Sequence, residues 1–521
     1  MTTAPRFKAA ALIGAGPGDP ELITVRGRAL LAQADVVVHD REVDARVLAL
    51  AAPGVELIDV GHAGPGALAE EAISYLIVEK AQEGKRVARL KWGDPFIFDR
   101  GGEEALFLRE QGVDVEVVPG VPIAVAASAF AGIPVTYPGA GDTLTIIRGQ
   151  DDTGTSMPDV DWTAIAGLNG TLLSYASAHQ LPRMLQALAA HGCPPDMPAA
   201  VVRHGTLPSQ SVEVSTVGAL ADSLAAQPRR DGGLLIVGRV VRFREHLRWF
   251  DARPLFGRTV LVTRPREQAA EFSERLTALG ARVIELPLIE IHPPLDPRAL
   301  ELAAGSAGRF DWVVFTSANA VDAFMGALDA LAQDARALGT ARLCAVGPAT
   351  AERLASYHLR VDLVPETFHA EGTFAALDAH GPLAGRRILL PQGDIARDVL
   401  AERLRAAGAE VTAVVAYRTV AREILREHDP DIYRMLLDGT LDCVTFTSGS
   451  AVRTFVRLIG EDAAVDLLKR TAVASIGPVT SDVARSLGID VTVQPEQFTI
   501  PALTDAIAAH FSGASPAPSR G

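Results

Sequence analysis

A glycine-rich turn near the amino terminus is the first stretch of this sequence that could perform chemistry. Residues 9–13 form an apolar run that predicts a buried strand, and Gly14-Ala-Gly-Pro-Gly-Asp-Pro20 follows at once. Glycines between a strand and a helix allow the backbone to approach a ligand closely, as nucleotide-binding loops do. Pro17 and Pro20 remove two N–H donors that a phosphate cradle would use. The turn therefore suits a ligand that carries an adenosine but no phosphates.

A repeated pair of hydroxyl residues could bind anions in the second half of the chain. Thr316-Ser317 and Thr447-Ser448 each follow a predicted strand and stand where a helix is expected to begin. In that position a hydroxyl can cap the helix or, together with the first-turn N–H groups, hold a carboxylate. Simple helix capping is the alternative at each site. The duplication favours binding, because two such loops facing each other across a cleft form a natural anion site.

The composition restricts the class of protein and its partners. The 521 residues exceed what one compact core supports, so we expect several globular units. A formal net charge of -14 argues against nucleic acid or an anionic membrane as the main partner. A polyanionic small substrate remains possible, because local arginine clusters determine the field of a site.

The termini and the cysteines give expectations about location and metals. The chain contains no run of about 18 apolar residues, and residues 1–8 lack the apolar core of a signal peptide. We therefore expect a cytoplasmic protein that does not enter a membrane. Cys193, Cys344 and Cys443 lie far apart and lack metal-ligand spacing, which predicts inert thiols and no bound metal.

The elements that must position these groups follow an alternating strand and helix pattern, which predicts an α/β protein. The pattern ends in an apolar run at residues 234–241, and a fresh strand at residues 259–263 begins a second unit. We therefore expect domains at residues 1–250 and 258–511, a linker at 251–257 and a disordered tail at 512–521.

An internal repeat organises the second unit. Thr316-Ser-Ala-Asn-Ala-Val321 returns as Thr447-Ser-Gly-Ser-Ala-Val452, and Val346-Gly-Pro-Ala-Thr350 returns as Ile476-Gly-Pro-Val-Thr480. The spacing is about 130 residues in each case. Two copies of one α/β module therefore build this half.

An ordered set of motifs in the first unit resembles uroporphyrinogen III C-methyltransferase, a member of the tetrapyrrole methylase family. The set consists of Gly14–Pro20, Asp40-Arg41, Gly93-Asp-Pro-Phe-Ile-Phe98, Arg100-Gly-Gly-Glu-Glu104, Val117-Val-Pro-Gly120, Ala131-Gly-Ile-Pro134 and Ile236-Val-Gly-Arg-Val-Val241. The resemblance implies a two-subdomain fold, a homodimer formed through this unit, and S-adenosylmethionine in the cleft between the subdomains. The residues implied to shape that pocket are Gly14, Gly16, Pro17, Gly18, Asp19, Gly93, Asp94, Pro95, Phe96, Ile97 and Phe98.

The resemblance also implies roles in methyl transfer. A pyrrole carbon attacks the sulfonium methyl, and a base must then remove a proton. Asp40 matches the aspartate that is a candidate for this step, and a helix N-cap is its alternative role. Arg100 is a candidate contact for the tetrapyrrole substrate.

Five positions depart from the family pattern near the expected pocket. Trp92 and Asp99 stand where the family has glycine, and the others are His62, Ala176 and Tyr137. A tryptophan in a ligand loop either reshapes the pocket or fills it. Two alternatives follow: an active methyltransferase, or a synthase whose degenerate methylase domain acts in dimerisation or regulation.

The second unit is similar to uroporphyrinogen III synthase over about residues 257–510. The similarity rests on Thr263-Arg-Pro265, the paired Thr-Ser and Gly-Pro-x-Thr turns, and Ala416-Tyr-Arg-Thr419. It implies a bilobal, duplicated flavodoxin-like fold, with lobe one at residues 258–290 and 420–511 and lobe two at 291–418. The implied reaction needs no cofactor: hydroxymethylbilane loses water and closes to uroporphyrinogen III with ring D inverted.

Such a reactive substrate mainly requires folding and positioning by the protein. Tyr417 could donate a proton to the departing hydroxyl, and packing at the connector between the lobes is its alternative role. Donors are needed for eight carboxylates, and the candidates are Arg264, Arg266, Thr316, Ser317, Thr447, Ser448 and Thr480. Arg397 and Arg418 are weaker candidates.

Together the two resemblances predict a bifunctional enzyme that makes uroporphyrinogen III and methylates it toward precorrin-2. A two-lobed small-molecule binding protein is the non-enzymatic alternative, which the methylase-like unit disfavours.

Overall fold

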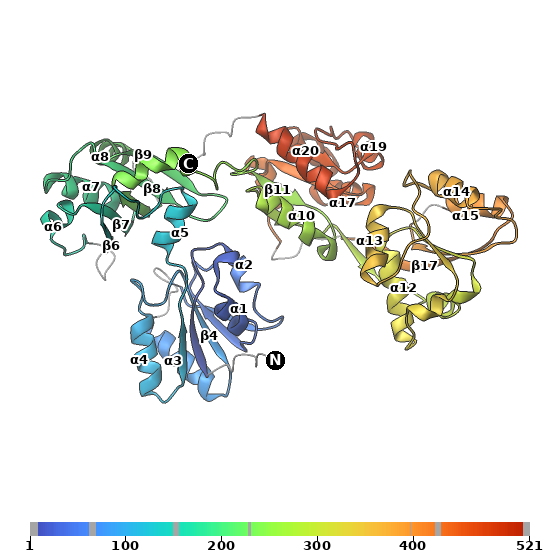
Figure 1. Ribbon diagram of the computed structural model, residues 1–521, viewed down its shortest axis with the longest axis horizontal. Helices are drawn as coiled ribbons and strands as arrows, with labels where there is room; N and C mark the ends of the chain where they lie inside the picture. Colours follow the sequence, from blue (N-terminus) through green and yellow to red (C-terminus); the bar gives the residue numbers. More distant parts are fainter. Residues whose placement is uncertain are drawn as a thin grey trace. The chain divides into compact units, whose positions relative to one another are not determined.

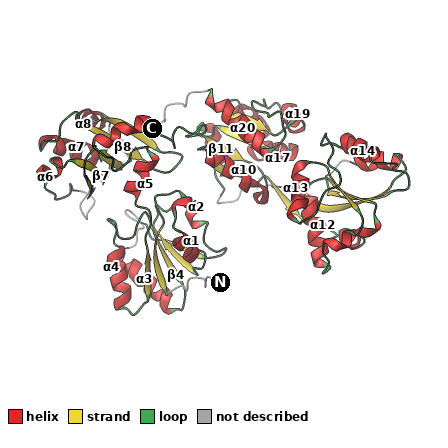
Figure 2. Ribbon diagram, viewed as in Figure 1, coloured by secondary structure: helices red, strands yellow, loops and turns green. Residues whose placement is uncertain are grey.

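The computed structural model describes residues 9–61, 69–149, 156–227, 231–395, 398–422 and 429–513. Internal contacts divide the chain into two compact units (Figure 1). The first contains the chain up to Arg258, together with Leu276–Arg282 and Phe511, and the second contains Thr259–Arg275 and Val283–His510. Both units are built from sheets flanked by helices (Figure 2), so the predicted α/β class is confirmed.

The first subdomain of unit one is a parallel sheet covered on both faces. Its five strands lie in the order β3-β2-β4-β1-β5. Central strands such as β2 are apolar and buried throughout, as expected for a parallel sheet between two helical layers. Helices α3 and α4 pack on one face, and α1 and α2 pack on the other. The elements are β1 (Ala10–Gly14), α1 (Val25–Leu31), β2 (Val36–His39), α2 (Ala45–Leu48), β3 (Glu56–Asp59), α3 (Glu70–Gln82), β4 (Val87–Lys91), α4 (Gly101–Glu110) and β5 (Val115–Val118).

The second subdomain contains a mixed sheet with the order β6-β7-β10-β8-β9. Strand β10 lies antiparallel to both of its neighbours, whereas β6 and β7 are parallel. One face is covered by α7 and α8, and the other by α5. The elements are α5 (Ile123–Phe130), β6 (Thr143–Arg148), α6 (Trp162–Ala166), β7 (Gly170–Ala176), α7 (Gln180–Ala190), β8 (Pro198–Arg203), β9 (Ser211–Thr216), α8 (Val217–Ala226), β10 (Gly233–Val237) and α9 (Arg244–Leu247).

The residues just before the expected linker pack against the second subdomain, and Arg253 of the linker packs on them. Trp249 Nε1 donates a hydrogen bond to the Ala129 carbonyl oxygen at 3.0 Å. The Phe250 ring contacts Phe130 edge to face at a centroid distance of 4.7 Å, and the Arg253 guanidinium lies 4.8 Å from the Trp249 ring. The chain after α9 therefore completes the first unit before β11 begins.

The second unit contains two parallel-rich sheets, and each combines strands from both copies of the repeat. The first has the strand order β12-β11-β18-β19, and the second has the order β13-β17-β16-β14-β15. The elements of the first are β11 (Thr259–Val262), α10 (Arg266–Ala278), β12 (Arg282–Glu285), α16 (Ile432–Leu437), β18 (Cys443–Phe446), α17 (Gly449–Ile459), α18 (Glu461–Leu468), β19 (Ala472–Ser475), α19 (Pro478–Ser486) and α20 (Ile500–Ser512). Those of the second are β13 (Ile289–His292), α11 (Arg298–Gly305), β14 (Trp312–Phe315), α12 (Ala318–Ala330), β15 (Arg342–Ala345), α13 (Pro348–Ser356), α14 (Ala370–Ala379), β16 (Arg387–Gly393), α15 (Val399–Ala406) and β17 (Glu410–Ala421).

The chain passes between the two sheets through β13 and the end of β17. These strands pair antiparallel, with Ile289 opposite Ala421 and His292 opposite Arg418. Helix α20 extends to Ser512, so the expected disordered tail does not begin there, and residues 514–521 lie outside the described residues. Among the described helices, none combines the length and apolar character needed to cross a membrane.

Candidate functional site

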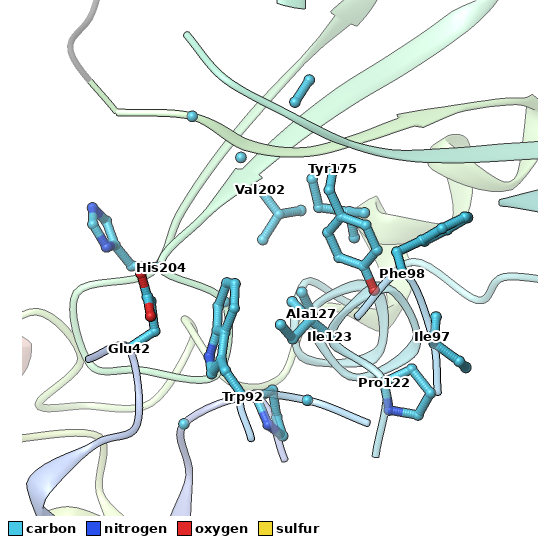
Figure 3. A pocket seen from close by; sticks show the side chains of 18 of the residues that line it. Glu42, Trp92, Ile97, Phe98, Pro122, Ile123, Ala127, Tyr175, Val202 and His204 are labelled. Atoms are coloured by element: carbon cyan, nitrogen blue, oxygen red, sulfur yellow. The ribbon is translucent and has the colours of Figure 1, made fainter. Parts of the chain in front are cut away.

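A cavity of about 600 Å³ opens between the two subdomains of unit one (Figure 3). This volume is typical of sites for small organic ligands, and the position beyond the carboxyl ends of parallel strands is where α/β proteins bind them. Six of the predicted pocket residues line the cavity: Pro17, Gly18, Gly93, Asp94, Ile97 and Phe98. The second subdomain contributes residues from the ends of β7, β8 and β10, including Tyr175, His204 and Asp231.

The other predicted pocket residues hold the loops together. Gly16 and Gly93 exchange backbone hydrogen bonds of 3.2 and 2.9 Å, and both have positive φ. A Cβ on Gly14 would overlap the backbone of Gly120, so Gly14 and Gly16 permit contact between loops, and Gly93 does so while also lining the cavity. Asp19 caps a short 3₁₀ helix through the Glu21 N–H. Pro95 accepts a hydrogen bond from the Gly101 N–H through its carbonyl oxygen, and Phe96 is exposed.

Asp94 joins two of these loops through its carboxylate. Its Oδ1 accepts a hydrogen bond from Phe96 N at 2.8 Å, and its Oδ2 accepts one from Gly120 N at 2.9 Å. The Gly-Asp-Pro motif therefore fixes the cavity wall, because both carboxylate oxygens are used to order backbone.

Asp40 lies at the cavity and is buried with an arginine. Its Oδ1 accepts a hydrogen bond from Arg89 Nη2 at 2.5 Å, and its Oδ2 accepts one from Trp92 N at 3.0 Å. The alternative role of Asp40 as a helix N-cap is wrong, because Asp44 caps α2 instead. Strands β2 and β4 are neighbours in the sheet, which places Asp40 beside Arg89 and Trp92.

Two further carboxylates extend this buried cluster. Lys91 Nζ lies 3.0 Å from Asp99 Oδ1 and 2.9 Å from Glu104 Oε1, and Glu104 also pairs with Arg89 at 3.2 Å. Burial raises the pKa of the Asp99 carboxyl, and the Lys91 ammonium offsets this only in part. The cluster holds three acids and two bases, so the cavity wall carries one excess negative charge when all are ionised.

The five residues that depart from the family pattern do not all lie at the cavity. Trp92, Asp99 and Ala176 line the cavity. Tyr137 does not, since it stacks on Phe243 at a centroid distance of 3.9 Å, and His62 lies outside the described residues. The cavity remains open beside Trp92, so the interpretation that this side chain fills the pocket is wrong.

Several cavity residues had no signal in the sequence. His204 Nε2 lies 3.3 Å from Asp231 Oδ2, and Glu42 approaches the same end of the cavity (Figure 3). His204 and Phe98 both have positive φ, at 49° and 53°. Such backbone strain in non-glycine residues concentrates at functional sites. His204 was missed because nothing near it in the sequence predicts that β8 ends at the cavity.

In the second unit the structure brings Tyr417 to Ser317. The Ser317 hydroxyl donates a hydrogen bond of 3.1 Å to the Tyr417 hydroxyl oxygen and also caps α12 by accepting from Ala320 N. The Tyr417 ring lies directly against Gly393, where a Cβ would come within 2.9 Å of Cζ. The Ser317 side chain can therefore cap α12 and contact Tyr417 at the same time.

Arg264 lies half-buried at the end of β11. Its Nη2 donates to Gln268 Oε1 at 3.1 Å, and Gln268 Nε2 donates to Asn319 Oδ1 of α12 at 2.6 Å. Its Nε is buried and has no hydrogen-bond partner among the described residues, and burial lowers the pKa of the guanidinium. The guanidinium therefore keeps a donor that the described part of the chain leaves unsatisfied.

The remaining candidates differ in accessibility. Thr316, Thr447 and Ser448 are half-buried, and Ser448 caps α17, whereas Thr480 is buried in the first turn of α19. Arg100 is exposed and pairs with Glu103, and Arg418 donates to the Pro293 carbonyl. The side chain of Arg266 and all of Arg397 lie outside the described residues.

Comparisons with known proteins identify both units. The tetrapyrrole (corrin/porphyrin) methylases match residues 11–221, and uroporphyrinogen-III synthase HemD matches residues 270–505. The porphyrin biosynthesis protein HemD of Ruminiclostridium josui is 36% identical over 497 residues, which cover 95% of this chain and 96% of that protein. The chain belongs to the tetrapyrrole methylases fused to uroporphyrinogen-III synthases. The predicted assignment as a bifunctional uroporphyrinogen III synthase and uroporphyrinogen III C-methyltransferase of tetrapyrrole biosynthesis is thereby confirmed.

Other relatives match one part of this fusion. Uroporphyrinogen-III C-methyltransferase of Bacillus subtilis is 34% identical over 64% of this chain and 68% of its own length. The siroheme synthase of Acinetobacter baylyi is 43% identical over 46% of the chain, which spans about half of that protein (52%). Among solved structures, uroporphyrin-III C-methyl transferase from Thermus thermophilus, complexed with S-adenyl homocysteine, is 37% identical over 45% of this chain and 98% of its own, with a TM-score of 0.39.

Proposed function

We propose that the cavity of unit one binds S-adenosylmethionine and methylates uroporphyrinogen III. The observation that carries this proposal is the chemistry of the lining, which combines an apolar wall with an excess of acids. The lining contains Asp40, Glu42, Asp44, Asp94, Asp99 and Asp231, against Arg148 and His204. Three of these acids, Asp40, Asp44 and Asp99, pair with bases outside the lining, which are Arg89, Arg46 and Lys91. A sulfonium and an ammonium group suit such a field, and an adenosine suits the apolar wall. The cofactor therefore fits the residues present.

Asp40 is the proposed proton acceptor of the methylation. S-adenosylmethionine supplies an electrophilic methyl group to a pyrrole carbon of the substrate. The ring then carries a positive charge, which it loses by releasing a proton. Arg89 and the Trp92 N–H fix the orientation of the Asp40 carboxylate, whose oxygens retain lone pairs that can accept this proton.

The second unit is proposed to close hydroxymethylbilane at the site around Tyr417 and Arg264. Because Ser317 donates to the Tyr417 oxygen, the phenolic proton is free to pass to the departing hydroxyl group. Arg264 offers a guanidinium edge to a substrate carboxylate. Other carboxylates of the substrate are proposed to bind to the hydroxyl residues Thr316, Ser317, Thr447 and Ser448. Further proposed contacts to substrate carboxylates are Arg266, Thr480 and, in the first unit, Arg100. A homodimer through unit one is also proposed.

The test is an anaerobic assay of the full chain with hydroxymethylbilane and methyl-labelled S-adenosylmethionine. We expect uroporphyrinogen III that carries label on two pyrrole carbons. Asp40→Asn is expected to leave ring closure intact and to slow methyl transfer at least about 100-fold, in line with loss of a general base. Asp222→Asn, the same change at an exposed position of α8, is the matched control. Normal labelling by Asp40→Asn would refute the role of Asp40.

A further inference from the structure

Trp92 has a fixed backbone and an exposed side chain. Its N–H is held by the Asp40 carboxylate at 3.0 Å, and its neighbours Lys91 and Gly93 are buried. The indole itself is 40% exposed in the cavity wall. A large aromatic surface is normally buried in a folded protein, so a rigidly anchored indole left open to a cavity indicates a surface that a ligand covers.

The indole lacks an aromatic partner within the protein. In the part of the chain that the structure describes, Trp249 contacts Phe130 and Trp312 contacts the imidazole of His380, whereas no ring is paired with Trp92 or with Trp162. Figure 3 shows the Trp92 indole projecting into the cavity between the side of Glu42 and His204 and the side of Ile123 and Ala127. Its flat faces are therefore available inside the site.

The cavity provides room for a flat ring beside this indole. The second subdomain contributes small residues to the lining, namely Ala176, Ser177, Gly205, Gly232 and Gly233. Ala176 and Trp92 both differ from the family pattern, one toward a smaller and one toward a larger side chain. The volume of about 600 Å³ that remains shows that the indole borders the space without occupying it.

We propose that Trp92 is a stacking platform for the adenine base of S-adenosylmethionine, an inference that rests on the proposed cofactor site. Adenine is neutral, flat and electron-poor, and it stacks well on an electron-rich indole. The tetrapyrrole is a poorer partner for this position. Its pyrroles are electron-rich, as the indole is.

The experiment titrates the full chain with S-adenosylhomocysteine, which is unreactive, by calorimetry and by tryptophan fluorescence. We expect Trp92→Gly to weaken binding by about 10- to 100-fold, as for loss of one stacked base, and Trp92→Phe to weaken it by less than about fivefold. The quenching of fluorescence on binding is expected to vanish in Trp92→Phe. It is expected to persist in Trp249→Phe, which removes a tryptophan of unit one outside the cavity.

The outcomes separate this inference from the proposed function. Each Trp92 variant keeps the backbone N–H that Asp40 binds, so the loop retains its main anchor. Equal or tighter binding by Trp92→Gly, or quenching that survives in Trp92→Phe, would overturn the platform while leaving the cofactor site in place. A wild-type chain that does not bind S-adenosylhomocysteine would overturn the cofactor site itself.

Discussion

Replacing Arg89 by methionine tests the buried charge cluster that shapes the cavity. The side chains of Arg89 and Asp40 are 3% and 6% exposed. The change removes the partner that lies 2.5 Å from Asp40 and 3.2 Å from Glu104, while methionine retains most of the apolar stem. The cluster would then hold three acids and one base. Breaking a buried ion pair from one side costs about 3–5 kcal/mol, because a charge remains without compensation.

Arg86 offers a matched control, because it directly precedes β4, the strand that contains Arg89. It forms a bidentate pair with Asp35 at 2.7 and 3.0 Å, but the two side chains are 47% and 35% exposed. A surface pair of this kind contributes about 0–1 kcal/mol. Arg86→Met therefore removes the same number of charges as Arg89→Met, but from an exposed pair with a single acid.

Hydrogen exchange of the full chain, measured by mass spectrometry, reports how much each variant destabilises the strands around the cluster. At neutral pH we expect the β2 and β4 amides to exchange about 100- to 1000-fold faster in Arg89→Met and less than about fivefold faster in Arg86→Met. Lowering the pH should reduce the effect of Arg89→Met, because protonated carboxylates no longer carry the uncompensated charge. Equal exchange in the two variants, or an effect of Arg89→Met that does not depend on pH, would refute the reasoning.

Three further predictions concern other parts of the chain. Tyr417→Phe should slow formation of uroporphyrinogen III and cost about 1 kcal/mol of stability through the lost Ser317 bond; an unchanged rate with wholly type III product would exclude Tyr417 as the proton donor. The Asp35–Arg86 pair lowers the pKa of Asp35 to about 2, so its stabilisation, below about 1 kcal/mol, is present above about pH 4 and lost as the pH falls toward 2. Acid titration of Asp35→Asn should lack this step, and an identical titration would contradict it. Burial raises the pKa of Cys344 to about 12 and also raises the pKa values of Cys193 and Cys443, so Ellman's reagent at pH 8 should modify these thiols only after unfolding.

Local signals in the sequence determined the elements and several of their ends. Buried strands were predictable from apolar runs, and Ser317 and Ser448 were predictable as helix caps, because a cap depends on residues within one turn. The repeat revealed the duplication in unit two for the same reason, since each copy carries its own turns. The family motifs identified both enzymes because they are short and contiguous.

The tertiary structure alone decided how these pieces form a site. Gly16 was predicted at the ligand pocket, but its backbone pairs with that of Gly93, which itself lines the cavity. Asp40 meets Arg89 only because the strand order places β2 beside β4, and His204 reaches the cavity only because β8 ends there. Such contacts depend on sheet order and on the packing of two subdomains. These are set by the free energy of the whole fold, which no single stretch of sequence contains.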